Sequence, residues 1–349
     1  MAQTATTTVQ DERVVRVSVL TRILQRPDAG ALLGAVAVFV LFSITAGEVN
    51  WATDGAIWSS WLNTAAYVGI VAVPVALLMI GGEFDLSAGV MIGSSGLFLG
   101  ILTTRLDWNI WPAIAVVLLF GLAVGFLNGY TVVRTGLPSF IVTLGTFFVL
   151  RGLNAGLTIK LTGGVSIANI DVASGFESAH KAFASIIWPE YGLSVSVLWW
   201  FGVTAVGAWL LARTRFGNWI FGSGGDQVAA RNVGVPVART KIALFMMTSL
   251  VASLWGVMTA VSLRGMQANE GVGREFEFII AAVVGGCLLT GGYGSVIGTA
   301  FGAAIIGMAQ IGIISSNWDS NYVYLFLGVI LVLAVMLNTA IRARAARAR

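Results

Sequence analysis

Long apolar runs separated by short polar stretches recur along almost the whole chain and decide what it can fold into. A bilayer core of about 30 Å needs about 20 apolar residues per helix, and runs of this length are unlike barrel strands, which alternate over about ten residues. Only 10% of the residues are charged, whereas soluble domains carry about 25%. The sequence therefore predicts an all-α polytopic membrane protein with ten spans, at roughly 29–47, 61–80, 88–104, 110–133, 138–158, 194–212, 242–263, 276–291, 296–314 and 321–341.

Basic residues between the spans predict the orientation of the chain. Cytoplasmic loops carry an excess of Lys and Arg, and most basic residues fall on the inner side when the N-terminus is inside. An odd number of spans would place either the N-terminal arginines or the C-terminal RARAARAR outside, so an even count is favoured, although eight or twelve spans satisfy the same rule. We expect both termini in the cytoplasm, with a tail over 1–28, a transmembrane domain over 29–341 and a basic tail over 342–349.

Two connections are long enough to form structures of their own. The outer one, 159–193, is partly polar and ends in an aromatic patch, and the inner one, 213–241, is the most basic loop. Inside the second, DQVAARNVG is typical of a short helix, because Asp226 suits an N-cap and Gly234 suits a C-terminal stop. Such a helix either joins two spans or docks a cytoplasmic partner, and the residues alone leave both interpretations open.

Two carboxylates lie in the stretch GGEFDLSAG, residues 81–89, between the second and third expected spans. A charge at mid-bilayer costs at least a few kcal/mol, so Glu83 and Asp85 either are solvated at the inner rim or face protein or water in a re-entrant dip. The stretch GGCLLTGG at 285–292 partly echoes this one, and Gly-interrupted repeats at corresponding positions line the path of many transporters. Four other acids are expected at water boundaries: Asp226, Glu270, Glu275 and Glu277.

Small and polar residues inside the expected spans favour helix packing. Gly121, Gly125 and Gly129 share one face of the fourth span, and such spacing lets helices of one subunit approach closely. Ser and Thr inside spans more often bond to a helix than to a substrate. Candidates for the translocation path or for a structural signature are Glu83, Asp85, Ser87, Asn128, Thr143, Thr146, Asn154 and Thr290.

Several kinds of chemistry are missing from the sequence. None of the three lysines stands in a GxxxxGK[ST] motif, so ATP hydrolysis through a Walker A loop is excluded. The single cysteine and the single histidine exclude an intrachain disulfide and argue against a metal centre or a haem site. No HExxH or GxSxG motif occurs. We therefore expect no enzyme activity, no cofactor and no metal.

Four stretches of the chain together form a family pattern. They are GGEFDLSAG, LPSFIVTLGTFFVLRGL (137–153), GNWIFGSGGDQVAARNVGVPVARTK (217–241) and AAVVGGCLLTGGYGSVIGTAFGA (281–303). In the same order, they resemble the permease subunits of bacterial ABC importers for monosaccharides such as ribose, xylose and galactose. The resemblance implies about ten spans in the bacterial inner membrane, a second permease copy forming a homodimer, cytoplasmic ATPase subunits, an extracytoplasmic sugar-binding protein, and no nucleic acid partner.

The same resemblance implies that the short inner helix couples the permease to the ATPase. Its residues are Asp226, Gln227, Val228, Ala229, Ala230, Arg231 and Gly234.

The chain departs from the family pattern at two positions. Val228 stands where the family often has Glu, so the ATPase contact would depend more on packing and on Arg231. Glu83 adds an acid that the family signature lacks. Asp85 belongs to the signature, and we expect it to hold the break by accepting backbone N–H groups at the start of the third span.

An ion-coupled secondary transporter of small polar solutes is the main alternative to an importer, with Glu83 or Asp85 carrying a proton. A membrane enzyme is a weaker alternative, because the sequence lacks any convergent set of His, Cys or carboxylate residues.

Overall fold

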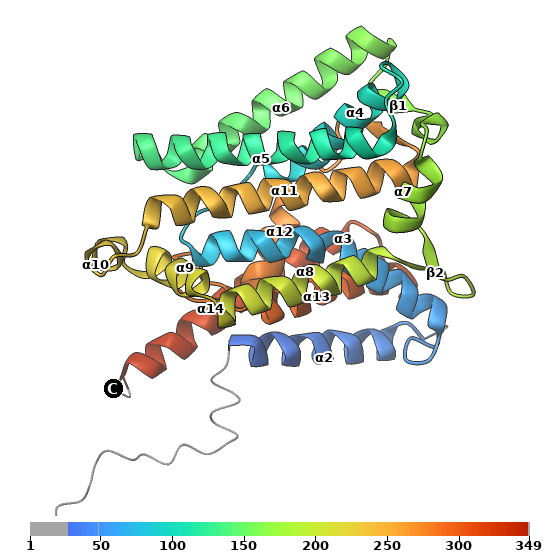
Figure 1. Cartoon of the computed structure of the whole chain (residues 1–349). Helices are drawn as coiled ribbons and strands as arrows, with labels where there is room; N and C mark the ends of the chain where they lie inside the picture. The colour runs from blue at the N-terminus through green and yellow to red at the C-terminus, as the bar shows by residue number, and fades with distance from the viewer. Residues whose placement is uncertain (1–26, 48, 348–349) are drawn as a thin grey trace, which may run out of the picture.

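Seven of the described helices are long and apolar enough to cross a membrane, so the chain is a multi-pass membrane protein. The computed structural model describes residues 27–347 except residue 48, and the expected N-terminal tail, 1–28, lies almost wholly outside them. The long helices lie roughly side by side in one bundle (Figure 1). They are α2 (Pro27–Thr45), α3 (Gly55–Ile80), α5 (Ile110–Thr135), α6 (Ser139–Thr162), α8 (Ser196–Arg213), α11 (Val237–Leu263) and α13 (Val296–Ser315).

Three further helices occupy the remaining expected spans. They are α4 (Ala88–Thr104), α12 (Arg274–Val284) and α14 (Tyr322–Arg347). The expectation of a helical span over 276–291 is wrong, because α12 ends at Val284 and the following residues up to Ser295 form a non-helical loop. Eleven residues of helix cover only about 16 Å, which is half of a bilayer core. α14 continues as helix into the expected basic tail at 342–349.

The polar connections lie at two ends of the bundle, which we call the α10 end and the α7 end. The α10 end, at the left of Figure 1, carries α9 (Arg215–Gly225) and α10 (Gln227–Asn232) from the expected inner loop. The α7 end, at the right, carries most of the expected outer loop. Its elements are β1 (Ser166–Ala168), η1 (Ile170–Val172), α7 (Phe176–Phe183), β2 (Ile186–Trp188) and β3 (Leu193–Ser194), with β1 paired antiparallel to β4 (Gly265–Gln267) and β2 to β3.

α3 is the most buried of the long helices and forms the centre of the bundle, with α8, α11, α12 and α13 packed around it. α11 packs most extensively on α5. The glycine face of α5 lies in this contact, where a Cβ would overlap atoms of α11 at each position, so these glycines pack helices within one chain as expected: Gly121, Gly125 and Gly129.

α3 and α12 end in the same backbone turn, which gives the sequence echo between 81–89 and 285–292 a structural meaning. In each turn the second glycine of a Gly-Gly pair has a positive φ, 84° at Gly82 and 95° at Gly286. The N–H of the next residue bonds back to the fifth carbonyl before it, at 3.1 Å in the first turn and 2.9 Å in the second. This is the Schellman ending of a helix, which needs a residue that tolerates the left-handed conformation.

The two turns meet α9 at a junction that has no room for side chains. Gly292, in the loop that follows the second turn, donates its N–H to the carbonyl oxygen of Ile80, the last residue of α3, at 2.8 Å. A Cβ on Gly224 of α9 would overlap that same carbonyl oxygen, and a Cβ on Gly291 would lie 2.7 Å from the Cα of Gly82. Three segments that are far apart in the sequence are therefore joined by direct backbone contact.

Replacing Gly224 by alanine is expected to lower the free energy of unfolding by about 1–3 kcal/mol, because the new Cβ must displace the Ile80 carbonyl. The matched control is Gly225→Ala, since a Cβ at Gly225 meets nothing within 4 Å. Thermal unfolding of both purified variants in one detergent should show a lower midpoint for Gly224→Ala alone. Equal midpoints would contradict the close backbone approach.

Candidate functional site

The chain between α3 and α4 is extended inside the bundle, and hydroxyl groups of α6 satisfy its backbone. The N–H of Phe84 donates to Ser139 Oγ at 3.0 Å, and the N–H of Leu86 donates to Thr143 Oγ1 at 3.1 Å. Ser139 and Thr143 are four residues apart and therefore lie on one face of α6. Without such acceptors, buried N–H groups in a membrane would each cost several kcal/mol.

A chain of hydrogen bonds then fixes the start of α4. Asp85 Oδ1 accepts the N–H and the hydroxyl of Ser87, which is the bond that the sequence predicts for Asp85. The Asn128 side chain of α5 donates to Ser87 Oγ at 3.0 Å and accepts from the Thr146 hydroxyl at 2.6 Å. Four candidate path residues thus bond to one another, while a role of theirs in lining a path stays a prediction.

Two of the remaining candidates, Asn154 and Thr290, lie apart from this network. Asn154 of α6 is buried, with a terminal atom of its amide 3.0 Å from the Ser94 hydroxyl of α4. Thr290 is exposed on the loop after α12, at the α10 end. The structure therefore does not gather the eight candidates into a single site.

Glu83 forms a buried ion pair with Lys241, in the second turn of α11. Both side chains are almost fully enclosed, 10% and 7% exposed. The sequence offered no account of Glu83, because its partner lies 158 residues further along the chain. The pair ties the turn after α3 to the end of the expected coupling loop.

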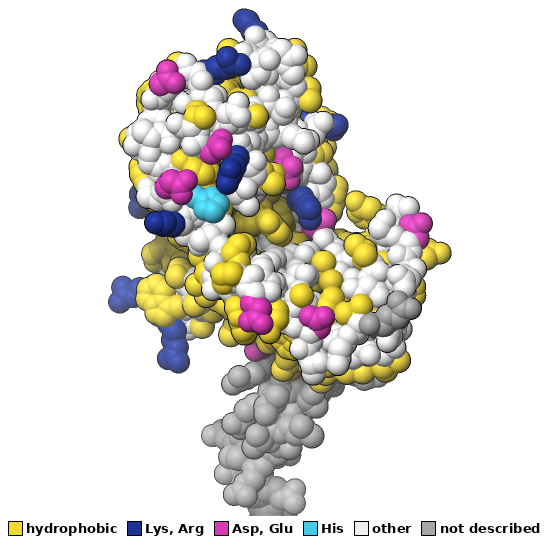
Figure 2. Space-filling model, turned by 90° about the vertical axis from the view of Figure 1, so that its right-hand side faces the viewer, with side chains coloured by type: hydrophobic (Ala, Val, Ile, Leu, Met, Phe, Trp, Pro, Cys, Tyr) yellow, Lys and Arg dark blue, Asp and Glu magenta, His cyan; other side chains and the backbone are white. Residues whose placement is uncertain are grey.

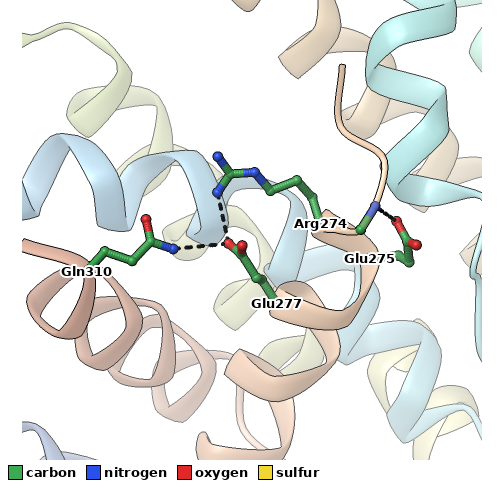
Figure 3. Close-up of polar contacts among 5 residues, drawn as sticks. Arg274, Glu275, Glu277 and Gln310 are labelled. Carbon is green, nitrogen blue, oxygen red and sulfur yellow. Dashed lines mark hydrogen bonds and ion pairs between the residues drawn. The ribbon is translucent and has the colours of Figure 1, made fainter. Parts of the chain in front are cut away.

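The first turns of α4 and α12 meet inside the bundle, at a charged cluster (Figure 3). Glu275 is buried, its Oε2 accepts the Gly273 N–H at 3.0 Å, and a Cβ on Gly89 of α4 would overlap that oxygen. The expectation that Glu275 lies at a water boundary is therefore wrong. Its carboxylate stands at two helix N-termini, where a negative charge is favoured.

Arg274 and Glu277 are the other charged residues of this cluster. Glu277 accepts from Arg274 Nη1 at 2.9 Å and from Gln310 Nε2 of α13 at 3.3 Å. This side of α12 is thereby fixed to α13.

A cavity of about 220 Å³ lies between α3, α8, α11 and the start of α12, near the α7 end. Its wall includes the rings of Tyr67 and Trp255, which meet edge to face with centroids 4.7 Å apart, and the charged groups of Glu270 and Arg274. Figure 2 shows the α7 end, where charged side chains surround a recessed band of hydrophobic ones between two lobes. No sequence motif predicted this cavity, because its residues come from six helices, one strand and the connection before α12.

The expected coupling helix is present as α10. Asp226 caps it by accepting the N–H groups of Val228 and Ala229 at 2.9 and 3.0 Å, and Gly234 follows it with a φ of 87°. Two valines, Val228 and Val233, are 67% and 81% exposed at its surface.

Among residues 27–47 and 49–347, no group of three or more His, Cys, Asp or Glu side chains is arranged to hold a metal ion. Cys287 is buried, with its sulfur 3.7 Å from the Thr299 hydroxyl.

Comparison with protein families matches residues 57–335 to the family described as "Branched-chain amino acid transport system / permease component". The xylose transport system permease protein XylH of Escherichia coli (strain K12) is 30% identical over 90% of this chain and 92% of its own length. The inner membrane ABC transporter permease protein YjfF of the same organism is 32% identical over 78% and 81%. The fructose import permease protein FrcC of Rhizobium meliloti is 31% identical over 82% and 78%. No solved structure matches the chain.

The buried ion pair generates a stability prediction. Glu83→Gln is expected to lower the free energy of unfolding by about 3–5 kcal/mol, because it leaves the Lys241 ammonium buried without a counter-charge. The double variant Glu83→Gln/Lys241→Met removes both charges and should recover most of that loss. Denaturant unfolding of the wild type, both single variants and the double variant gives the coupling energy directly.

The control for this cycle is Asp171→Asn, which breaks the exposed pair with Arg264 and should cost at most about 1 kcal/mol. Additive effects of the Glu83 and Lys241 substitutions would show that the buried pair contributes no interaction energy.

Proposed function

Because the chain belongs to the family of branched-chain amino acid transport system permease components, we propose that it is the membrane-spanning permease subunit of an ATP-binding-cassette importer in the bacterial inner membrane. The solute is a monosaccharide or a similar small polyhydroxylated molecule. The observation that carries this proposal is similarity over 78–90% of the chain to proteins named as xylose, fructose and inner membrane ABC permeases. The family description mentions amino acids, so the test must separate the two solute classes.

We infer ten crossings with both termini and the α10 end in the cytoplasm. The basic connection 213–241 supports this orientation, since positive residues stay inside. The third and eighth crossings each combine a non-helical stretch with a helix, α4 or α12. Transporter sites are often built from such interrupted helices.

The ATPase partner binds at α10 in this proposal. The helix is short, capped and largely exposed, and it presents two valines on a surface that also carries Arg231. Exposed apolar side chains at the water-facing end of a membrane protein favour burial against a partner. The absence of a Walker A motif from the sequence supports a proposal in which ATP hydrolysis belongs to that separate subunit.

The remaining partners follow from the same assignment. A solute-binding protein docks at the α7 end, where the folded outer connection lies, and a second copy of the chain completes the path. Specific recognition is left to the binding protein, which suits a permease in which four of the candidate path residues bond to one another.

An ion-coupled mechanism through Glu83 or Asp85 has less support. Glu83 is paired with Lys241, and one oxygen of Asp85 accepts the N–H and the hydroxyl of Ser87 at the start of α4, so both acids have a structural role. The named relatives are permease proteins, one of them of an ABC transporter, and none of the three is named as an ion-coupled transporter.

Uptake by the reconstituted complex tests the function. Liposomes holding the chain and its ATPase, with ATP inside and the binding protein outside, should import at least one of D-xylose, D-ribose or D-fructose and should not import L-leucine. An ATPase variant that cannot hydrolyse ATP is the control. Leucine uptake without sugar uptake, or sugar uptake driven by a proton gradient alone, would contradict the proposal.

Val233→Glu is expected to reduce uptake at least about tenfold, a loss of about 1.4 kcal/mol in coupling, because it places a charge in the contact between α10 and the ATPase. The bundle should stay folded, since Val233 is 81% exposed. The matched control is Val172→Glu, exposed at the α7 end. Co-purification with the ATPase should fall for Val233→Glu and stay unchanged for Val172→Glu.

A further inference from the structure

We propose that the cavity between α3, α8, α11 and the start of α12 is a monosaccharide contact site inside the permease. The solute would occupy it after leaving the binding protein and before passing toward the α10 end. The inference rests on the proposed function and adds a binding site to it.

The polar groups of this cavity are largely without protein partners, which is the first observation. Ser196 is 4% exposed and lines the cavity, and its Oγ is buried with no hydrogen-bond partner. In the described part of the chain, no hydrogen bond or ion pair engages the Glu270 carboxylate, the Tyr67 hydroxyl or the Ser262 hydroxyl. Buried polar groups are normally satisfied, so the free Ser196 hydroxyl is unusual. The other three groups are not fully buried, with Tyr67 42% exposed, and are therefore free to contact a solute that enters.

The charged groups supply both kinds of hydrogen bond that a diol needs. The Glu270 carboxylate only accepts, while the Arg274 guanidinium uses Nη1 toward Glu277 and keeps other N–H donors. Both residues line the cavity. Adjacent sugar hydroxyls donate to one group and accept from the other, and hydrogen bonds to charged groups are the stronger class.

The aromatic rings supply the apolar part of the site. Tyr67 of α3 and Trp255 of α11 meet edge to face at an interplanar angle of 75°. The C–H face of a sugar ring packs on an aromatic ring, so the site presents apolar and polar walls together. Binding pockets are mostly apolar, with a few polar groups that fix orientation.

Size and position agree with a small solute. The volume of about 220 Å³ equals about seven waters at about 30 Å³ each, which suits a monosaccharide and is small for a disaccharide. The segment from Glu270 to Arg274 leads into the N-terminus of α12 inside the bundle. Binding must stay weak, because a conducting site has to release what it binds.

The experiment measures protection of a thiol placed in the cavity. The full-length chain carrying Ser262→Cys is placed in nanodiscs without ATPase or binding protein and labelled with a maleimide, while native Cys287 is buried. One of D-xylose, D-ribose or D-fructose at about 50 mM should slow labelling at least about threefold, as expected for a Kd below about 25 mM. Sucrose at the same concentration should not slow it.

Two further variants make the result specific. Adding Glu270→Gln or Tyr67→Leu to the Ser262→Cys chain should abolish the protection. Ser320→Cys, on the exposed connection before α14, is the control probe and should label at a rate that no sugar changes.

The outcomes separate this inference from the function itself. Import by the full complex without thiol protection overturns the contact site and leaves the function standing. Protection by sucrose as strong as by monosaccharides, or protection that survives both variants, overturns the site as well. Monosaccharide protection in a chain whose complex imports no sugar supports the site and overturns the function.

Discussion

Backbone hydrogen bonding inside the bundle is the constraint on which the rest of this structure depends. A membrane span normally satisfies its N–H and C=O groups as a helix, yet this chain is non-helical just before α4 and runs through consecutive turns just before α12. Ser139 and Thr143 of α6 accept hydrogen bonds from backbone N–H groups of the first non-helical stretch. Asp85 accepts the N–H of Ser87 where the helix begins again. The polar residues near 81–89 are therefore needed first for the fold, which is why two acids stand beside apolar runs.

The helix starts that these breaks create meet within the protein. The first turns of α4 and α12 come together at Gly89 and Glu275, where the buried carboxylate faces two positive helix ends. The second break also places charged groups at the cavity, because Glu270 lies in the turns before α12, Arg274 is the first residue of α12, and both line the cavity. Under the proposed function, the helix is interrupted at the cavity, where polar groups have room to contact a solute.

Hydropathy predicted where the chain crosses the bundle, since a helix or buried stretch stands at every expected span. It was wrong about helicity at 276–291, because an apolar composition does not distinguish a helix from the loop that follows Gly285 and Gly286. The sequence correctly predicted features that depend on residues close together in the chain, such as the Asp226 cap of α10. The Glu83–Lys241 pair and the cavity were not predictable, because they join residues that are distant in sequence and carry no periodic signal.

α11 connects the two regions that matter for transport under the proposed function. It begins four residues after α10, carries Lys241 in its second turn and carries Trp255, Thr259 and Ser262 toward its other end. A helix of 27 residues extends about 40 Å, and its close packing on the glycine face of α5 resists bending. A displacement of α10 is therefore transmitted along one rigid element, and it reaches the Glu83 turn and the cavity wall together. Under the proposed function, the single helix α11 would therefore serve both the coupling to the ATPase and the contact with the solute.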